Sequence, residues 1–339
     1  MINAEAHGLS SPGGNMPKSV RFQSVGGPEV LQLEEVVVGD PGPGEARVLH
    51  KACGVNFLDI YQRSGLYKLP LPSGAGNEGS GVVEAVGAGV IHVKPGDRVA
   101  YAGGPLGGYC EVRNMPADRL CILPEGLSFE QGAAMMLKGM TAQYLIRRTY
   151  KVQPGDTVLF HASAGGVGLI ACQWLKALGA TVIGTAGSDM KCALAKQHGV
   201  DHCINYRTEK FSERVKEITK GAGVPVVYDS VGKDTFMGSL ECLRPLGLMV
   251  SFGSSSGLVP PVELGLLMQY GSLFLTRPSL NTYAAKRIDL EAISKDLFDI
   301  VLAGKVNIEI GRRYPLKNAA QAHRDLEARK TTGSSILIP

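Results

Sequence analysis

The spacing of apolar and polar residues changes near residue 128 and predicts a different kind of structure on each side. From residue 20 to residue 123, short runs with partial period-two alternation are separated by turns rich in glycine and proline. Short strands at this spacing are typical of a compact, mostly β, barrel-like domain. Strands are predicted at residues 30–34, 47–51, 81–86 and 98–101, with one helix near residues 56–64.

Beyond residue 128, strand-like runs alternate with stretches of helical spacing. Ser128 and Gln131 can form a capping box, so we predict a helix from there to about Arg147 that links two domains. The alternation that follows predicts a parallel, doubly wound sheet with helices on both faces. Strands are predicted at residues 181–184, 202–206, 225–229, 248–252 and 272–276, helices at 190–197, 212–219, 287–302 and 319–329, and a closing strand at 335–338 that returns to the first domain.

The stretch from residue 158 to residue 178 organises this second part. An apolar run ends in a turn of small residues, and apolar positions then recur at helical spacing, so one helix face packs on a sheet. The turn reads Ala-x-x-Gly-x-x-Gly over residues 162–168, with alanine in place of the first glycine of the usual dinucleotide fingerprint. Gly165 and Gly168 allow a tight turn and a close approach, and a helix N-terminus suits a pyrophosphate. The alternative is an ordinary strand–turn–helix of an α/β protein.

Length, charge and cysteine usage narrow the class of protein. The chain has 339 residues, enough for two domains, and a net charge of +4 without a run of Lys or Arg. This balance does not favour nucleic acid as a partner, and no apolar run is long enough for membrane insertion. Seven scattered cysteines without a C-x-x-C pair indicate reduced thiols and a cytoplasmic location. We expect residues 1–15, which lack the features of a signal peptide, to be a disordered extension.

Several motifs together resemble one group of enzymes. They are GVNFLDIY at residues 54–61, LKGMTA at 137–142, VYDSVG at 227–232, RPS at 277–279 and GSS at 333–335. With the small-residue turn, they resemble the zinc-free NADPH:quinone oxidoreductases of the medium-chain dehydrogenase/reductase superfamily, the group that includes zeta-crystallin and the bacterial quinone reductases. The likeness covers nearly everything after residue 20.

This resemblance implies an α/β fold with two domains. A GroES-like, mostly β barrel domain is expected to carry the catalytic residues and to comprise residues 16–138 and 280–339. A Rossmann domain with a doubly wound parallel sheet is expected to bind NADPH over residues 139–279.

The resemblance also bears on metal binding. Zinc-dependent relatives place a Cys and a His where this chain has Asn56 and Asn77, and their four-cysteine structural loop is missing here. An amide is a poor ligand for Zn²⁺, which prefers thiolate, imidazole or carboxylate. We therefore expect no metal.

The residues after the second strand of the nucleotide domain indicate NADPH rather than NADH. A fold selective for NAD usually has an acid at the end of that strand, whereas this chain has small residues there and Asp189 only at the following helix start. By resemblance, Ser188, Lys191 and Tyr206 form the site of the 2′-phosphate. The alternatives are that Lys191 lies on a solvated helix face and that Tyr206 only packs.

Further cofactor-binding residues follow from the resemblance and from the rule that ligands bind beyond the carboxyl ends of parallel strands. Arg277 could equally be a structural salt-bridge partner, and the two tail residues could close over the cofactor. The full cofactor set adds Asn56, Lys138, Thr141, Gly165, Gly166, Val167, Gly184, Thr185, Ser230, Phe252, Gly253, Ser254, Phe274, Arg277, Gly333 and Ser334.

A polar pocket of Asn56 and Tyr61, with Tyr67 nearby, is predicted to be catalytic. Asn56 offers an amide N–H and Tyr61 a phenol O–H to an oxygen that gains negative charge during reduction. Asp59 and Arg63 are expected to face solvent or to pair with each other. The alternative is that Asn56 caps its helix and Tyr61 only packs.

The resemblance implies a zinc-independent oxidoreductase that transfers reducing equivalents from NADPH to quinones. One alternative is an NADPH-dependent reductase of enones or enoyl thioesters, although the basic cluster that a long thioester carrier favours is missing. Another is a non-catalytic NADPH-binding protein, such as a crystallin or an RNA-binding protein, and the weak net charge argues against RNA. A homodimer is expected from the relatives, with strands near Phe274 pairing across the interface.

Overall fold

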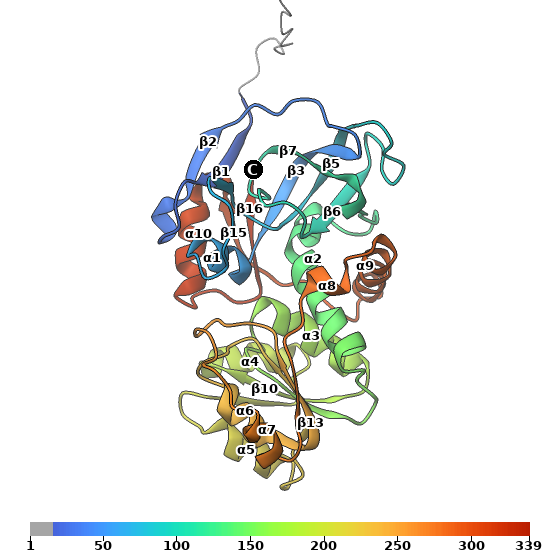
Figure 1. The fold of residues 1–339 in the computed structure, drawn as a ribbon. Coiled ribbons are helices and arrows are strands. Elements are labelled where there is room, and N and C mark those ends of the chain that lie inside the picture. The colour runs from blue at the N-terminus through green and yellow to red at the C-terminus, as the bar shows by residue number, and fades with distance from the viewer. Residues whose placement is uncertain (1–15) are drawn as a thin grey trace, which may run out of the picture.

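The computed structural model describes residues 16–339, so the predicted extension over residues 1–15 lies outside the described residues. The chain forms two lobes, one built mainly from its first third and its C-terminal end, the other from its middle (Figure 1). Both expected domains, the GroES-like β domain and the Rossmann domain, are present.

The first lobe contains two sheets whose strand pairs are mostly antiparallel. A three-stranded sheet has the order β2-β1-β4, and a larger one has the order β15-β16-β3-β5-β6-β8, with β7 also paired to β3. The strands are β1 (Lys18–Phe22), β2 (Gln32–Glu35), β3 (Glu45–Val55), β4 (Ser73–Gly74), β5 (Glu78–Val86), β6 (Arg98–Ala102), β7 (Val112–Pro116), β8 (Cys121–Ile122), β15 (Ile310–Pro315) and β16 (Ser334–Ile338).

Most strand predictions in this lobe are confirmed, with one shift. The segment predicted as a strand at residues 30–34 begins with a short 3-10 turn, Pro28–Val30, because proline fixes φ at the first turn position. The strand proper is β2. The closing strand returns to this lobe as predicted, since β16 pairs antiparallel with β3, with Leu337 opposite Cys53.

The second lobe is a six-stranded sheet in which every strand pair is parallel. Its order is β11-β10-β9-β12-β13-β14, which reverses direction between β9 and β12. The strands are β9 (Thr157–Phe160), β10 (Thr181–Ala186), β11 (His202–Asn205), β12 (Val224–Asp229), β13 (Leu243–Ser251) and β14 (Phe274–Thr276).

Helices cover both faces of this sheet, because alternate strand residues point to opposite cores. Val158 and Phe160 of β9 belong to the core that contains Trp174, whereas Leu159 belongs to the core that contains Leu240. The helices of the second lobe are α3 (Gly166–Ala177), α4 (Asp189–Gln197), α5 (Phe211–Ile218), α6 (Phe236–Cys242) and α7 (Gly265–Gln269). The predicted α/β, doubly wound fold is confirmed.

The helix α2 (Phe129–Tyr144) joins the two lobes (Figure 1). It begins with the predicted capping box: the Gln131 backbone N–H donates to Ser128 Oγ at 3.1 Å, and the Ser128 backbone N–H donates to Gln131 Oε1 at 2.9 Å. One turn of π-helix, Leu145–Thr149, extends it past Arg147. Because α2 runs from Phe129 to Tyr144, the predicted domain boundary between residues 138 and 139 falls inside this helix, which both lobes share.

The remaining helices flank the junction or return to the first lobe. The predicted helix at 287–302 coincides with α9, and that at 319–329 ends two residues earlier than expected. These helices are α1 (Phe57–Arg63), α8 (Leu280–Tyr283), α9 (Arg287–Leu302) and α10 (Ala319–Glu327). No helix within residues 16–339 combines the length and the apolarity needed to cross a membrane.

Candidate active site

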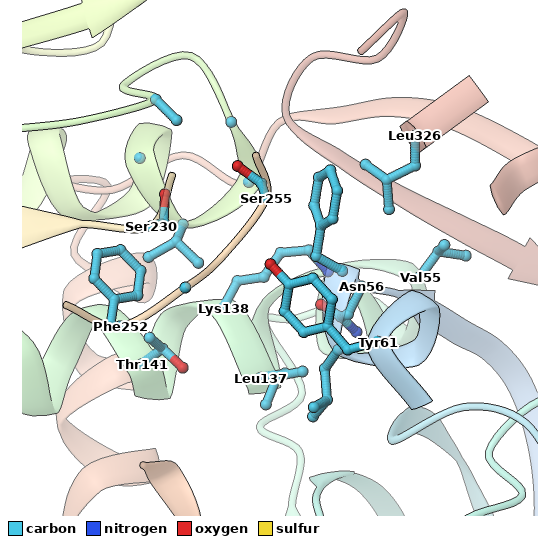
Figure 2. A pocket seen from close by; sticks show the side chains of 18 of the residues that line it. Val55, Asn56, Tyr61, Leu137, Lys138, Thr141, Ser230, Phe252, Ser255 and Leu326 are labelled. Atoms are coloured by element: carbon cyan, nitrogen blue, oxygen red, sulfur yellow. The ribbon is translucent and has the colours of Figure 1, made fainter. Parts of the chain in front are cut away.

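A cleft of about 750 Å³ lies between the two lobes, at the carboxyl ends of β9 and β12. The sheet order reverses between these strands, and open α/β sheets bind ligands at such a switch point. Figure 2 shows Asn56 and Tyr61 on one side of the cleft and Ser230 and Phe252 on the other. Of the residues predicted to bind cofactor or substrate, those in the lining are Asn56, Tyr61, Tyr67, Lys138, Thr141, Gly165, Gly166, Val167, Lys191, Tyr206, Ser230, Phe252, Gly253, Arg277 and Gly333.

The turn between β9 and α3 is built differently from the expectation based on its glycines. The left-handed residue is Ala162, with φ of 52°, while Gly165 has an ordinary φ of −82° at the N-cap of α3. Gly168 serves packing, because a Cβ there would lie 2.4 Å from the Ala162 carbonyl oxygen. Gly165 also pairs with Gly333 as an isolated bridge, so the tail lies against the start of α3.

Cationic and phenolic groups gather at the end of the cleft beside α4. The Lys191 ammonium donates to the Arg329 carbonyl oxygen at 2.7 Å, and the Arg329 guanidinium donates to Tyr206 Oη at 3.4 Å. Partial burial, with the nearby charges of Arg329 and Arg207, lowers the pKa of Lys191. Two cations and a phenol close together favour an anion such as a phosphate.

Sequence reasoning missed Arg329. It is the last residue of the helix predicted at residues 319–329, lies far in sequence from the nucleotide-binding turn, and carries no local motif. Only the tertiary packing of the tail against α4 brings it to the cleft.

Ser188 and Asp189 do not line the cleft. The Ser188 hydroxyl caps α4 by accepting the Lys191 N–H at 3.3 Å, which is the usual role of serine at a helix start. Asp189 Oδ1 accepts a hydrogen bond from the Asn205 side-chain amide at 2.8 Å. The carboxylate at the start of α4 is thus engaged with β11.

Five other predicted cofactor residues also lie outside the lining. Thr185 is buried with its hydroxyl 2.9 Å from His161 Nδ1, and a Cβ at Gly184 would lie 2.6 Å from Ser163 Oγ. Phe274 is 60% exposed on β14, at the sheet edge. The other two are Ser254, whose N–H donates to Tyr61 Oη, and Ser334, whose hydroxyl donates to the Ala134 carbonyl oxygen.

A buried carboxylate, Glu78, organises the floor of the cleft. It is fully buried and accepts hydrogen bonds from Asn56 Nδ2 at 2.8 Å, from the Leu137 N–H at 2.7 Å and from the Lys138 ammonium at 3.2 Å. The Lys138 side chain passes over Gly166, where a Cβ would lie 2.7 Å from Lys138 Cδ. Lys138 and Glu78 thus form a buried ion pair beneath the cleft.

Two tyrosines of the first lobe contact the second lobe across the cleft. Tyr61 Oη accepts the Ser254 backbone N–H at 3.0 Å, and Tyr67 Oη accepts from Arg277 Nη2 at 3.1 Å. The Tyr61 and Tyr67 rings lie 5.3 Å apart. Arg277 also donates to the Gly253 carbonyl oxygen at 2.8 Å, so it holds backbone rather than forming an ion pair. The predicted triplet of Asn56, Tyr61 and Tyr67 lies together in one cleft.

The expectation for Asp59 and Arg63 is wrong. Both side chains are buried, at 3% and 2% exposed, and they do not pair with each other. Asp59 accepts the Asn56 N–H at 2.8 Å, which caps α1, whereas Arg63 pairs with Glu327 at the end of α10 at 2.5 Å. Packing of α10 on α1 buries the face that the sequence alone assigns to solvent.

At the two positions where zinc-dependent relatives have metal ligands, this chain has asparagines whose side-chain amides are hydrogen-bonded to neighbouring side chains. Asn56 Nδ2 bonds Glu78, and Asn77 Nδ2 bonds Asp59 Oδ1 at 2.7 Å and Gln62 Oε1 at 2.6 Å. Within residues 16–339, no three or more His, Cys, Asp or Glu side chains converge in a way that could hold a metal ion.

The cleft fits a phosphorylated dinucleotide on three observations. The α3 N-terminus faces it through Gly165 and Gly166, which suits a pyrophosphate. Lys191, Arg329 and Tyr206 provide a cationic end. Gly187 leaves space at this end, since a Cβ there would lie 2.5 Å from Tyr206 Oη.

Comparisons with known proteins agree with this geometry. The alcohol dehydrogenase GroES-like domain model matches residues 42–156, and the zinc-binding dehydrogenase model matches residues 166–289. A quinone oxidoreductase of Pseudomonas aeruginosa is 54% identical over 96% of this chain and 100% of its own length, and a 2-haloacrylate reductase of a Burkholderia species is 47% identical over 93% of this chain and 96% of its own length.

The solved structure of Escherichia coli quinone oxidoreductase complexed with NADPH superimposes with a TM-score of 0.94 at 53% identity, over 95% of this chain and 100% of that chain. Matches of this extent, together with the two-lobe fold and the cleft, establish the relationship. The chain belongs to the quinone oxidoreductase family within the medium-chain dehydrogenase/reductase superfamily.

Proposed function

We propose that this protein reduces quinones with NADPH and does so without a metal ion. The observation that carries the proposal is one cleft with a cationic, phenolic end formed by Lys191, Arg329 and Tyr206 and a second wall formed by Asn56 and Tyr61. The first feature fits the 2′-phosphate of NADPH. The second offers hydrogen-bond donors to a carbonyl oxygen.

NADPH, when bound, supplies the hydride. Gly165 and Gly166 would hold its pyrophosphate, and Lys191 with Arg329 would hold its 2′-phosphate. On the opposite wall, Tyr61 Oη accepts the Ser254 N–H, so its own O–H is still able to donate to a substrate oxygen. Burial raises the pKa of Tyr61, so the phenol keeps its proton and acts as a hydrogen-bond donor.

Asn56 contributes in a second way. One N–H of its amide is taken by Glu78, and the other is available to the cleft. The protonated tyrosine and the neutral amide can thus both donate hydrogen bonds that stabilise negative charge on the quinone oxygen. We infer that the final proton comes largely from solvent.

The rival functions are less well supported. The 47% identity to a 2-haloacrylate reductase keeps reduction of an activated alkene as a second candidate, and the same hydrogen-bond donors would serve it. For enoyl thioesters a basic cluster at the mouth is expected. Among the described residues, the cations that line the substrate side are Lys68, Lys138 and Arg277; Lys138 is paired with Glu78, and Arg277 is engaged with backbone. A non-catalytic role would leave the donors of the second wall without a purpose.

Replacing Lys191 with alanine is expected to raise the KM for NADPH by roughly tenfold or more, because a charge-assisted phosphate contact is lost, and to leave the KM for NADH nearly unchanged. Steady-state kinetics with both cofactors checks this. Lys196→Ala on the same helix, outside the cleft lining, is the matched control. Equal changes for the two cofactors would show that Lys191 does not read the phosphate.

We also propose a homodimer and a cytoplasmic location. The strand β14 is an edge strand, and Phe274 is 60% exposed and Leu275 39% exposed on it, near the exposed Leu246 and Met268. An exposed apolar edge strand is a ready partner for a second copy. Sedimentation is expected to give twice the mass of one chain; a monomer at micromolar concentration would contradict this. All seven cysteines are free thiols, which favours a reducing compartment.

A further inference from the structure

A carboxyl group that contacts no cation among the described residues lies behind Asn56 and Asn77, on the side of the cleft proposed to bind substrate. Asp59, 3% exposed, accepts hydrogen bonds from Tyr109 Oη at 2.6 Å, from Asn77 Nδ2 at 2.7 Å and from the Asn56 backbone N–H at 2.8 Å. Asn56 and Asn77 line the cleft, and Asp59 does not. All three donors are neutral, so hydrogen bonds rather than a contacting cation compensate the buried charge.

These hydrogen bonds determine where the Tyr109 hydroxyl proton points and which ring nitrogen of His323 is protonated. The single Tyr109 hydroxyl proton is donated to Asp59, so the 3.1 Å contact between Tyr109 Oη and His323 Nε2 requires Nε2 to carry the proton and to donate. His323 Nδ1 is then an acceptor, and it is buried without a partner. Burial and the nearby Arg63 lower the pKa of His323 to about 3, which keeps this ring neutral.

The ionised carboxylate fixes how the cleft wall presents its polar atoms. Because both Asp59 oxygens accept, Asn77 must turn its nitrogen toward Asp59, and that nitrogen also donates to Gln62 Oε1 at 2.6 Å. Protonation would give Asp59 a donor, which conflicts with the Asn77 N–H or with the Tyr109 O–H. Protonated Asp59 would therefore release or flip the amide and change the pattern of donors facing the substrate.

We propose that Asp59 is a positioning residue whose ionised carboxylate sets the hydrogen-bonding pattern of Asn56, Asn77 and Gln62, so that reduction of the quinone requires Asp59 to be ionised. This inference rests on the proposed function.

The surroundings of Asp59 place its titration within the working range of an enzyme. Burial raises the pKa of Asp59 to about 6, while the hydrogen bonds from Tyr109, Asn77 and the Asn56 N–H, and the charge of Lys138, act in the opposite direction. The other titratable or charged groups around it, from the elements packed against it, are Cys53 on β3, Glu78 on β5, Arg63 on α1 and His323 on α10.

The sign of the pH effect separates activity from unfolding. The pKa of Asp59 in the folded protein lies above the ordinary value of 3.8, so the folded state binds this proton more tightly than the unfolded state does. The contribution of Asp59 to stability is therefore present at low pH and is lost as pH rises through about 6. Activity is expected to change in the opposite direction and to fall as pH decreases through about 6.

The test is the pH profile of kcat/KM for a quinone in the full-length protein and three variants, with NADPH binding followed by fluorescence. The wild type is expected to lose about tenfold for each pH unit below the midpoint, as a single titrating group requires. Tyr109→Phe removes a bond to the charged form and should move the midpoint up by about one pH unit or more. Asp59→Asn should abolish the acid limb and lower kcat/KM by roughly 10–100-fold, with NADPH binding retained.

Tyr314→Phe is the matched control, because it also removes a buried tyrosine's hydrogen bond to an aspartate, Asp325, at 2.8 Å in the same lobe. It should leave the midpoint unchanged. If the wild type is active but its acid limb is the same in Tyr109→Phe, or persists in Asp59→Asn, the proposed role of Asp59 is overturned while the proposed function stands. A wild type that reduces no quinone at any pH would overturn the proposed function, and this inference with it. Tyr109→Phe remains informative if Asp59→Asn does not fold.

Discussion

Tyr61→Phe is expected to lower kcat for quinone reduction by about 10²–10³-fold, with the affinity for NADPH unchanged. The phenyl ring keeps its place against Tyr67 and Phe57, while the hydroxyl that faces the cleft is lost. Negative charge develops on the quinone oxygen as hydride arrives, and a donor fixed in a cleft that excludes water stabilises that charge more than it stabilises the ground state. The loss of the hydroxyl is therefore expected to lower kcat rather than to raise KM.

The hydroxyl of Tyr61 also joins the two lobes through the Ser254 N–H, so the control must separate chemistry from packing. Tyr150→Phe removes another phenol hydroxyl, which donates to Asp156 at 3.3 Å outside the cleft, and should keep the wild-type rate. Stopped-flow single turnovers at saturating NADPH give the rate of the chemical step. A Tyr61→Phe variant with a wild-type rate, or one that loses rate only together with its melting temperature, would show that Tyr61 is structural.

Lys138→Met is expected to destabilise the folded protein by about 3–5 kcal/mol, because it leaves the Glu78 carboxylate buried without its cation. The Glu78 side chain is 0% exposed and that of Lys138 is 8% exposed, so solvent cannot replace the ammonium. The remaining donors, Asn56 Nδ2 and the Leu137 N–H, are neutral. The free energy of unfolding from urea titration measures the loss.

A second substitution and a surface pair test this explanation. In the double variant Lys138→Met with Glu78→Gln, at least half of the lost stability should return, because the buried negative charge is removed and the single oxygen of the new amide can still accept the Leu137 N–H. Lys176→Met breaks a pair with Asp201 whose side chains are 53% and 26% exposed, and it should cost less than about 1 kcal/mol. Equal losses in Lys138→Met and Lys176→Met would contradict a strong pair at Glu78.

The fold was predictable because its signals are local and periodic. Period-two runs with Gly-Pro turns gave β3, β5 and β6, and helical spacing gave α9 with its observed bounds. Helices without a clear cap or amphipathic period, such as α6, escaped prediction.

The site was predictable only in part, for a physical reason. Asn56, Tyr61, Lys191 and Tyr206 lie at or near the ends of strands and the starts of helices, where backbone geometry alone directs side chains to a cleft. Arg329 and the burial of Asp59 depend on how α10 and the tail pack, and this long-range packing leaves no local pattern.

The small-residue turn shows the same limit at a single position. Its composition indicated a tight turn correctly, yet the left-handed residue is Ala162 rather than a glycine. An alanine in that conformation is uncommon, because its Cβ crowds the backbone. Which residue of the turn adopts it is decided by the strand and helix that the turn connects, including the contact between Gly168 and the Ala162 carbonyl oxygen.

The most direct test of the central claim is quinone-dependent oxidation of NADPH by the purified, chelator-treated protein, with hydroquinone formed measured beside NADPH consumed and the metal content determined on the same sample. The predicted result is rapid, saturable oxidation of NADPH in preference to NADH, dependent on added quinone and unchanged by chelation. Absence of quinone-dependent turnover, or activity that disappears with a stoichiometric metal and returns when the metal is restored, would contradict it.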